Sequence, residues 1–147
     1  MSGRALVIAY GNPLREDDGV AWEVARLLES RAHLDVRTVH QLVPELAWAL
    51  SDADSVVFVD ACRGGQAGRV REETVVEADP SGADPHSLDP ARLLGLCHAL
   101  YGRVPRATLV SIAGARFGFG DELSEPVRRA VPAVVRRILA GASAGEP

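Results

Sequence analysis

The stretch from Ala5 to Leu28, ALVIAYGNPLREDDGVAWEVARLL, contains the pattern that decides the fold. Its first six residues form a continuous apolar run, which is typical of a β-strand buried on both faces of a parallel sheet. After a Gly-Asn-Pro turn, apolar residues recur at the spacing of a helix, at Val20, Val24, Leu27 and Leu28. We therefore expect a strand, a turn and a helix.

The same alternation of strand and helix continues along the chain. Strands are predicted near residues 4–10, 34–40, 55–61, 69–77 and 106–113, the fourth of them a half-exposed edge strand. Helices are predicted after Pro44, after Asp89 as the helix cap, and over 123–139. This alternation predicts an α/β fold, a three-layer sandwich in which helices cover both faces of a mostly parallel, twisted five-stranded sheet.

Length and composition predict one soluble domain. The 147 residues are 47% hydrophobic and 24% charged, as in ordinary globular proteins. We assign residues 1–140 to a single α/β domain and residues 141–147, GASAGEP, to a flexible tail. A net charge of −4 with interspersed signs does not favour nucleic acid or anionic lipid. Neither a signal peptide nor a membrane span is indicated, so we expect a cytoplasmic protein, and we expect a monomer.

Two features of the composition restrict the chemistry. All 16 basic residues are arginine, so a Walker-type phosphate loop, a Schiff base and a lysine general base are excluded. The two cysteines, Cys62 and Cys97, are not spaced as a disulfide framework or a zinc site, and we interpret them as buried free thiols.

Acidic residues follow two of the predicted strands. In open α/β sheets ligands bind beyond the carboxyl ends of the strands, where the strand order reverses. If the order begins 2-1-3, the acids at 16–18 and Asp60 share that edge. Asp17 or Asp18 could equally cap the first helix, but Asp60 ends a core strand and must be paired, hydrogen-bonded or metal-bound. His86, on a loop flanked by prolines, would on its own be typical of a solvated residue.

Other known uses of such a fold fit less well. A phosphoacceptor receiver domain also has acids after its first strand and an aspartate on its third, but it needs a lysine that this chain lacks. A dinucleotide or flavin module would require a G-x-G-x-x-G loop after the first strand, and a serine hydrolase would require G-x-S-x-G. No G-x-G-x-x-G is present, and no G-x-S-x-G follows a predicted strand.

Four blocks of the sequence resemble the [NiFe]-hydrogenase maturation endopeptidases. They are VIAYGNPLREDDGVAWEVARLL (Val7 to Leu28), QLVPELA (Gln41 to Ala47), VVFVDACRGGQAG (Val56 to Gly68) and DPHSL (Asp84 to Leu88). The first contains G-N-x4-D-[DE]-G after an apolar strand, which is fairly specific when an Asp-Ala pair at a later strand end and a loop histidine follow.

The resemblance implies an endopeptidase that removes the C-terminal extension of a hydrogenase large-subunit precursor after nickel insertion. Carried over by motif, the family's metal-contacting residues are Asp18, Asp60 and His86, with Asp18 and Asp60 as the catalytic acids. Nickel would be brought by the substrate, and cadmium or zinc could replace it experimentally, because an O,O,N ligand set accepts all three. Whether a carboxylate or the metal activates water stays open.

The chain departs from the family pattern at two positions. Ala21 and Glu16 occupy places where glycine is common, which leaves a role of Glu16 in the site open. His40, at the end of the second predicted strand, is interpreted as a supporting or structural residue. Two alternatives remain: a hydrolase of the same fold that acts on another protein, and a non-catalytic metal-binding or receiver-like module.

Overall fold

The computed structural model describes residues 4–82, 84 and 88–144. Five strands, one short 3₁₀ segment (η1) and four helices alternate along the chain. Their bounds are β1 Ala5–Tyr10, η1 Glu16–Gly19, α1 Val20–Leu28, β2 Leu34–Val39, α2 Leu46–Ser51, β3 Ser55–Cys62, β4 Val70–Thr74, α3 Pro90–Tyr101, β5 Arg106–Ala113 and α4 Glu125–Ala144.

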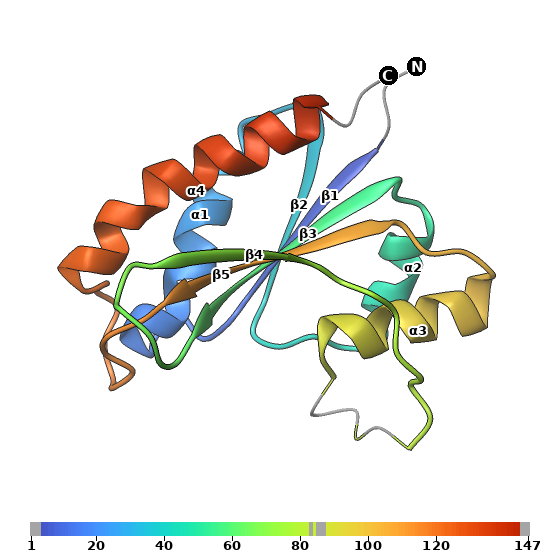
Figure 1. Ribbon diagram of the computed structural model, residues 1–147, viewed down its shortest axis with the longest axis horizontal. Helices are drawn as coiled ribbons and strands as arrows, with labels where there is room; N and C mark the ends of the chain where they lie inside the picture. Colours follow the sequence, from blue (N-terminus) through green and yellow to red (C-terminus); the bar gives the residue numbers. More distant parts are fainter. Residues whose placement is uncertain (1–3, 83, 85–87, 145–147) are drawn as a thin grey trace.

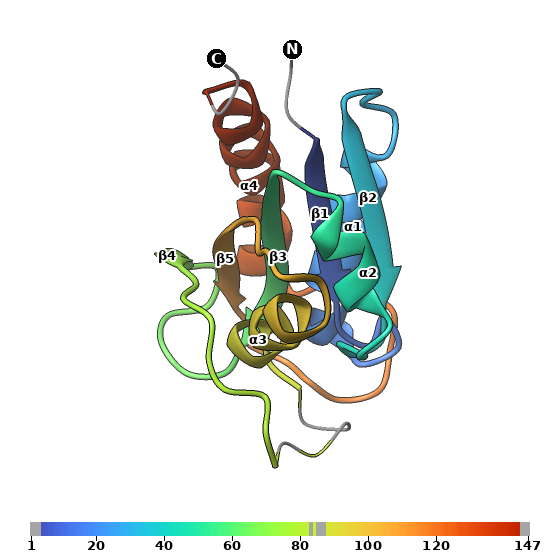
Figure 2. The ribbon, with the colours of Figure 1, turned by 90° about the vertical axis from the view of Figure 1, so that its right-hand side faces the viewer.

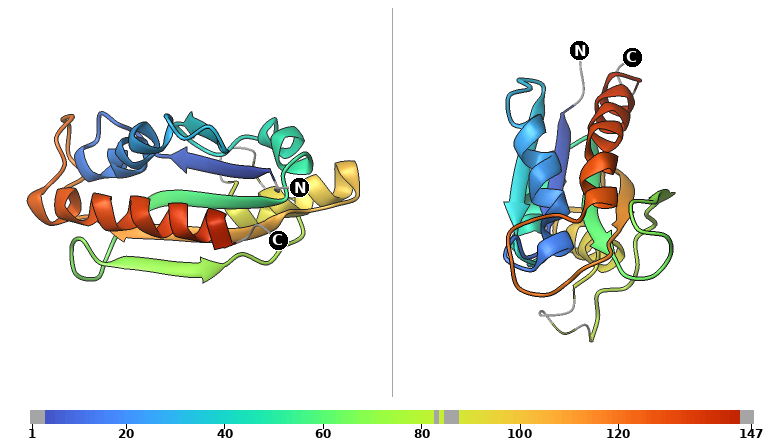
Figure 3. Two further views of the ribbon diagram at one scale, coloured as in Figure 1. Left: turned by 90° about the horizontal axis from the view of Figure 1, so that it is seen from above. Right: turned by 90° about the vertical axis from the view of Figure 1, so that its left-hand side faces the viewer.

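The strands form a single sheet in the order β2-β1-β3-β5-β4. All neighbours are parallel except β4, which pairs antiparallel with β5 at the edge. Figure 3 shows β4 along that outer edge, in light green. The order 2-1-3, on which the shared edge of the acids depends, is present, and the predicted edge position of the fourth strand and the α/β sandwich are confirmed.

Two helices cover each face of the sheet (Figure 1 and Figure 2). Helices α1 and α4 pack over one face, on side chains such as Val7, Val59 and Ile112. Helices α2 and α3 pack over the other, on side chains such as Ile8 and Phe58. Because side chains alternate along a strand, β1 and β3 are apolar on both faces, which accounts for their continuous apolar runs.

The ends of the predicted helices differ in detail from those observed. Asp89 caps α3 as predicted, and its carboxylate accepts a hydrogen bond of 2.8 Å from the Arg92 amide. The last helix begins at Glu125 and continues to Ala144. Residues 141–144, which the sequence assigned to a flexible tail, therefore extend α4, while residues 145–147 lie outside the described part. No helix in the described part is long and apolar enough to cross a membrane.

Candidate active site

Asp60 lies near the carboxyl end of β3 on the face covered by α2 and α3. Its carboxylate Oδ2 accepts a hydrogen bond of 2.8 Å from the hydroxyl of Tyr10, the last residue of β1. Its Oδ1 is buried and has no hydrogen-bond partner within the described part of the chain. A buried polar atom without a partner is uncommon in folded proteins and often marks a place where a ligand or ion binds.

The surroundings of Asp60 favour its protonated form. Burial raises the pKa of this carboxyl group, and the hydroxyls of Ser111 and Tyr10 oppose that shift. The negative charges of Asp18 and Glu73 raise the pKa further. Ser111 is the register partner of Asp60 on β5, which places both side chains on the same face of the sheet. The influence of the Asp18 charge on Asp60 is what is expected if both carboxylates border one site.

Asp18 is held by the loop that follows β1. Its carboxylate Oδ2 accepts a hydrogen bond of 2.8 Å from the Asn12 amide, and its side chain is only half-buried. The loop is tight, because a Cβ added at Gly11 would lie 2.1 Å from the carbonyl oxygen of Asp18. Gly11 also has a φ of +145°, so glycine is required there for two reasons. The G-N pair of the motif thus positions Asp18.

Asp17 has a different role from its neighbour. Its side chain is fully buried and accepts hydrogen bonds from the amides of Ala115, Arg116 and Ser124, and from the Ser124 hydroxyl, at 2.7–2.9 Å. Burial alone would raise the pKa of Asp17, but these hydrogen bonds outweigh it and lower the pKa. The expectation that it caps the helix after it is wrong, since neither η1 nor α1 has a side-chain cap. Asp17 instead fastens the β5–α4 loop, which Figure 3 shows in orange passing the start of α1.

Glu16 also contacts the β5–α4 loop. Its carboxylate accepts a hydrogen bond of 3.0 Å from the Gly118 amide and lies 3.5 Å from the Arg116 guanidinium. Its φ of +51° is in the left-handed region, which explains why glycine suits this position. Of the three consecutive acids, Glu16 and Asp17 therefore bind the β5–α4 loop, and Asp18 is left as a half-exposed carboxylate.

The third predicted metal ligand, His86, lies outside the described residues. Within the described part, no three side chains of His, Cys, Asp or Glu gather closely enough to hold a metal ion. Two residues past the end of the undescribed segment, the charge of Asp89 acts on the Tyr10 phenol. Burial first, then the charge and hydrogen bond of Asp60, and then the charge of Asp89 raise the pKa of the Tyr10 phenol. The start of α3 is therefore close to the Tyr10–Asp60 pair.

His40 lies outside this group of carboxylates. Its exposed ring meets the edge of the Trp22 ring at a centroid distance of 5.3 Å. The Trp22 indole N–H donates to the carbonyl of Gly11 at 2.9 Å. His40 therefore supports the loop that carries Asp18 indirectly, through its contact with Trp22. A structural role for His40 agrees with these contacts.

Comparison with known proteins finds relatives of this chain among solved structures. The sequence matches no protein-family model and no curated protein. Among solved structures, the hydrogenase maturating endopeptidase HybD from E. coli has a TM-score of 0.81 and 21% identity, over 97% of this chain and 94% of that one. HybD from Thermococcus kodakarensis has a TM-score of 0.78 and 24% identity, over 95% and 99%. A hydrogenase 2 maturation peptidase from a Thaumarchaeota archaeon has 26% identity and a TM-score of 0.69, over 94% and 97%.

The chain has the fold of the hydrogenase maturation endopeptidases. These similarities confirm the fold that the resemblance of the four sequence blocks implied. The strand order also separates this fold from the receiver-type order 2-1-3-4-5, because here β5 and not β4 adjoins β3.

The sequence analysis did not identify two polar residues that interact with Asp60. Tyr10 and Ser111 end or interrupt apolar strands, and both act on Asp60. The available signal was their position: Tyr10 is the polar member of the otherwise apolar β1, and Ser111 is the last polar residue of β5. Both lie near the carboxyl ends of their strands, on the face shared with Asp60.

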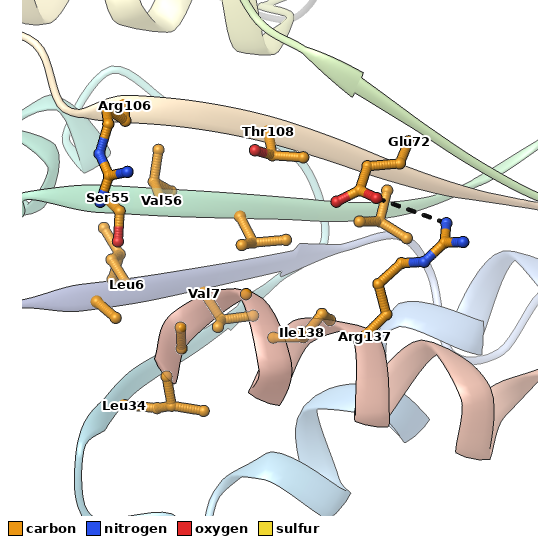
Figure 4. A pocket seen from close by; sticks show the side chains of 15 residues that line it. Leu6, Val7, Leu34, Ser55, Val56, Glu72, Arg106, Thr108, Arg137 and Ile138 are labelled. Atoms are coloured by element: carbon orange, nitrogen blue, oxygen red, sulfur yellow. Dashed lines mark ion pairs between the residues drawn. The ribbon is translucent and has the colours of Figure 1, made fainter. Parts of the chain in front are cut away.

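A separate cavity of about 120 Å³ lies between the sheet and the C-terminal half of α4 (Figure 4). It is bordered by Ala5, Ser55 and Arg106, the first residues of three parallel strands. Its one carboxylate, Glu72, is 3.6 Å from the Arg137 guanidinium. Since this is the amino edge of those strands, the cavity is remote from Asp18 and Asp60.

Proposed function

We propose that this protein is an endopeptidase that removes the C-terminal extension of a nickel-loaded [NiFe]-hydrogenase large-subunit precursor. The observation that carries the proposal is the buried Oδ1 of Asp60, which has no hydrogen-bond partner among the described residues, together with the half-exposed Asp18, in the fold of the maturation endopeptidases. We further propose that the protein acts as a monomer in the cytoplasm.

In this account the nickel belongs to the substrate and serves as its recognition element. Asp18, Asp60 and His86 would contact it and so position the bond to be cleaved. The two carboxylates fit a cation, because Oδ1 of Asp60 has no hydrogen-bond partner of ordinary geometry in the described part of the chain, and because the charge of Asp18 disfavours the ionised form of Asp60 when no cation lies between them. Cadmium or zinc should bind the same residues at about 2.0–2.4 Å, as is usual for such ligands.

Hydrolysis then consumes one water molecule. The water oxygen bonds to the carbonyl carbon, the carbon–nitrogen bond breaks, and a proton reaches the departing amine. A carboxyl group whose pKa is raised is suited to accept the proton from water and to deliver it to that amine. We therefore propose an aspartic-type mechanism in which Asp18, Asp60 and His86 contact the substrate metal and Asp60 also carries the proton.

The test is to mix the purified protein with a large-subunit precursor that is nickel-loaded or nickel-free, and to weigh the products by mass spectrometry. The proposal predicts loss of the C-terminal extension from the nickel-loaded form only. If neither form is cut, or if both are cut equally, the proposal in this form is wrong. Labelling of Asp60 by acetyl phosphate would favour the receiver-like alternative.

A further inference from the structure

A second group of residues borders the carboxyl edge of the sheet, two positions beyond Asp60. A hollow of about 450 Å³ is lined by Arg63, Arg69 and Arg71, together with Cys62, Ala113 and two glycines. We call it the arginine hollow. Cys62 lies at the rim of this hollow, two residues beyond Asp60 on β3. Because a strand rises about 3.3 Å per residue, the rim is roughly 7 Å from Asp60, on the same face of the sheet. The charge of Asp60 acts directly on the Cys62 thiol.

The three guanidinium groups of the hollow are exposed and uncompensated. None of them forms an ion pair with a carboxylate in the part of the chain that the structure describes. No acidic side chain lines the hollow. In a protein with a net charge of −4, three unpaired cations around one concave surface form a local site for anions.

The walls of the hollow are fixed by the fold. The Gly68 amide donates to the Ala113 carbonyl at 2.7 Å, and the Ala113 amide donates to the Arg69 carbonyl at 2.9 Å. A Cβ at Gly68 would lie 2.6 Å from the Pro126 carbonyl oxygen, so this loop packs closely against the start of α4. The Arg63 guanidinium lies 4.1 Å above the Phe117 ring, which holds it at the rim. A preformed site loses less entropy when a ligand binds.

The floor of the hollow is open. Gly64 and Gly65 have φ values of +88° and +78°, a conformation that side chains rarely adopt. An added Cβ at either glycine would meet no atom within 4 Å. The two glycines therefore leave space for a ligand backbone next to the arginines.

We propose that the arginine hollow binds carboxylate groups of an acidic segment of the polypeptide substrate, beside the bond to be cleaved. This inference rests on the proposed function, which makes a polypeptide the substrate that crosses this edge of the sheet. Arginine clusters are a recurring means of recognising acidic segments, because the planar guanidinium matches a carboxylate with two parallel hydrogen bonds. The hollow would hold the chain while Asp18 and Asp60 act on it.

The binding test needs no proteolysis. Acetylated and amidated hexaglutamate is titrated into the ¹⁵N-labelled protein, with hexaglutamine as the matched uncharged peptide. We expect hexaglutamate alone to shift the amide signals of Gly64, Gly65 and Ala113. R63Q and R71Q should each weaken this binding about tenfold, and R71K should retain part of it. R136Q is the matched control, because Arg136 is an exposed arginine on α4, over the other face of the sheet.

Several results would overturn the proposal. They are the absence of shifts at the hollow, equal weakening by R136Q, and tighter binding of inorganic phosphate than of hexaglutamate. With a precursor that wild type processes, R63Q and R71Q should raise KM and leave kcat within about twofold, since they remove binding and not chemistry. If hexaglutamate binds at the hollow but wild type cuts no precursor, the proposed function fails and the anion site stands. If R71Q processes at wild-type KM, the hollow has no substrate role.

Discussion

Asp17 and Ser124 lie 107 positions apart, yet two hydrogen bonds of 2.7 Å join them, one from the Ser124 amide and one from its hydroxyl. Ser124 directly precedes α4, so the carboxylate of Asp17 caps a helix distant in sequence. This contact closes the β5–α4 loop over the segment that carries Asp18. Removal of the Asp17 charge should therefore reduce stability.

Asp17→Asn should lower the free energy of unfolding by about 2–4 kcal/mol, because a buried carboxylate loses charge-assisted hydrogen bonds and introduces an amide that finds donors around it. Asp18→Asn is the matched control, and it should cost less than about 1 kcal/mol because Asp18 is half-exposed and has one hydrogen-bond donor. Urea unfolding followed by circular dichroism measures both values. Equal stability of the two variants would contradict the different roles assigned to these neighbours.

Gly11→Ala should destabilise the protein by more than Gly102→Ala. Both glycines have positive φ values, so both substitutions introduce backbone strain of about 1 kcal/mol. At Gly11 the new Cβ would also lie 2.1 Å from the Asp18 carbonyl oxygen, whereas at Gly102 it would meet nothing. Thermal unfolding of the two variants gives the comparison. A Gly11→Ala protein no less stable than Gly102→Ala would show that the loop after β1 is not as tight as described.

Tyr10→Phe should slow precursor processing about tenfold without unfolding the protein, since it removes the hydrogen bond to Asp60 and leaves the ring in place. The chain has one other tyrosine, Tyr101, which is exposed on α3, and Tyr101→Phe serves as the control. As a positioning residue, Tyr10 should affect kcat more than KM. Wild-type kcat in Tyr10→Phe would remove Tyr10 from the site.

Cys62→Ala should retain precursor processing. Cys62 lies on the same strand as Asp60, but burial and the Asp60 charge raise the pKa of its thiol, which disfavours the reactive thiolate. Cys97→Ala is the control, because it removes the other thiol of the chain, which is buried. Mass spectrometry of the processed precursor measures the activity. Loss of processing in Cys62→Ala, with the fold intact, would require a thiol mechanism in place of an aspartic one.

The sequence predicted the parts of this structure that depend on local pattern. Continuous apolar runs indicated the buried strands, and Asp89 before Pro90 indicated the start of α3. Parallel topology then placed residues 16–18 and Asp60 at one edge of the sheet. The end of α4 was missed because the Gly and Ala residues at 141–144 have no periodic apolar pattern, although the helix continues through them.

The distinct roles of the three consecutive acids depend on contacts across the chain. Asp17 and Glu16 bind the loop at 115–118, about one hundred positions away, and no local pattern encodes that partner. Tyr10 and Ser111 meet Asp60 only because strand register aligns their ends. The arginine hollow likewise combines the end of β3 with β4 and the loop that joins them. Long-range pairing of this kind is visible only in the folded chain.

The central claim is that Asp18, Asp60 and His86 act together on a nickel-loaded precursor. The most direct measurement is processing of that precursor by Asp18→Ala, Asp60→Ala, His86→Ala and Asp17→Ala, with circular dichroism to verify folding and mass spectrometry to follow the product. The account predicts that the first three variants are folded and inactive, and that Asp17→Ala loses activity only as far as it loses stability. Normal processing by all three ligand variants, or a folded but inactive Asp17→Ala beside an active Asp18→Ala, would contradict it.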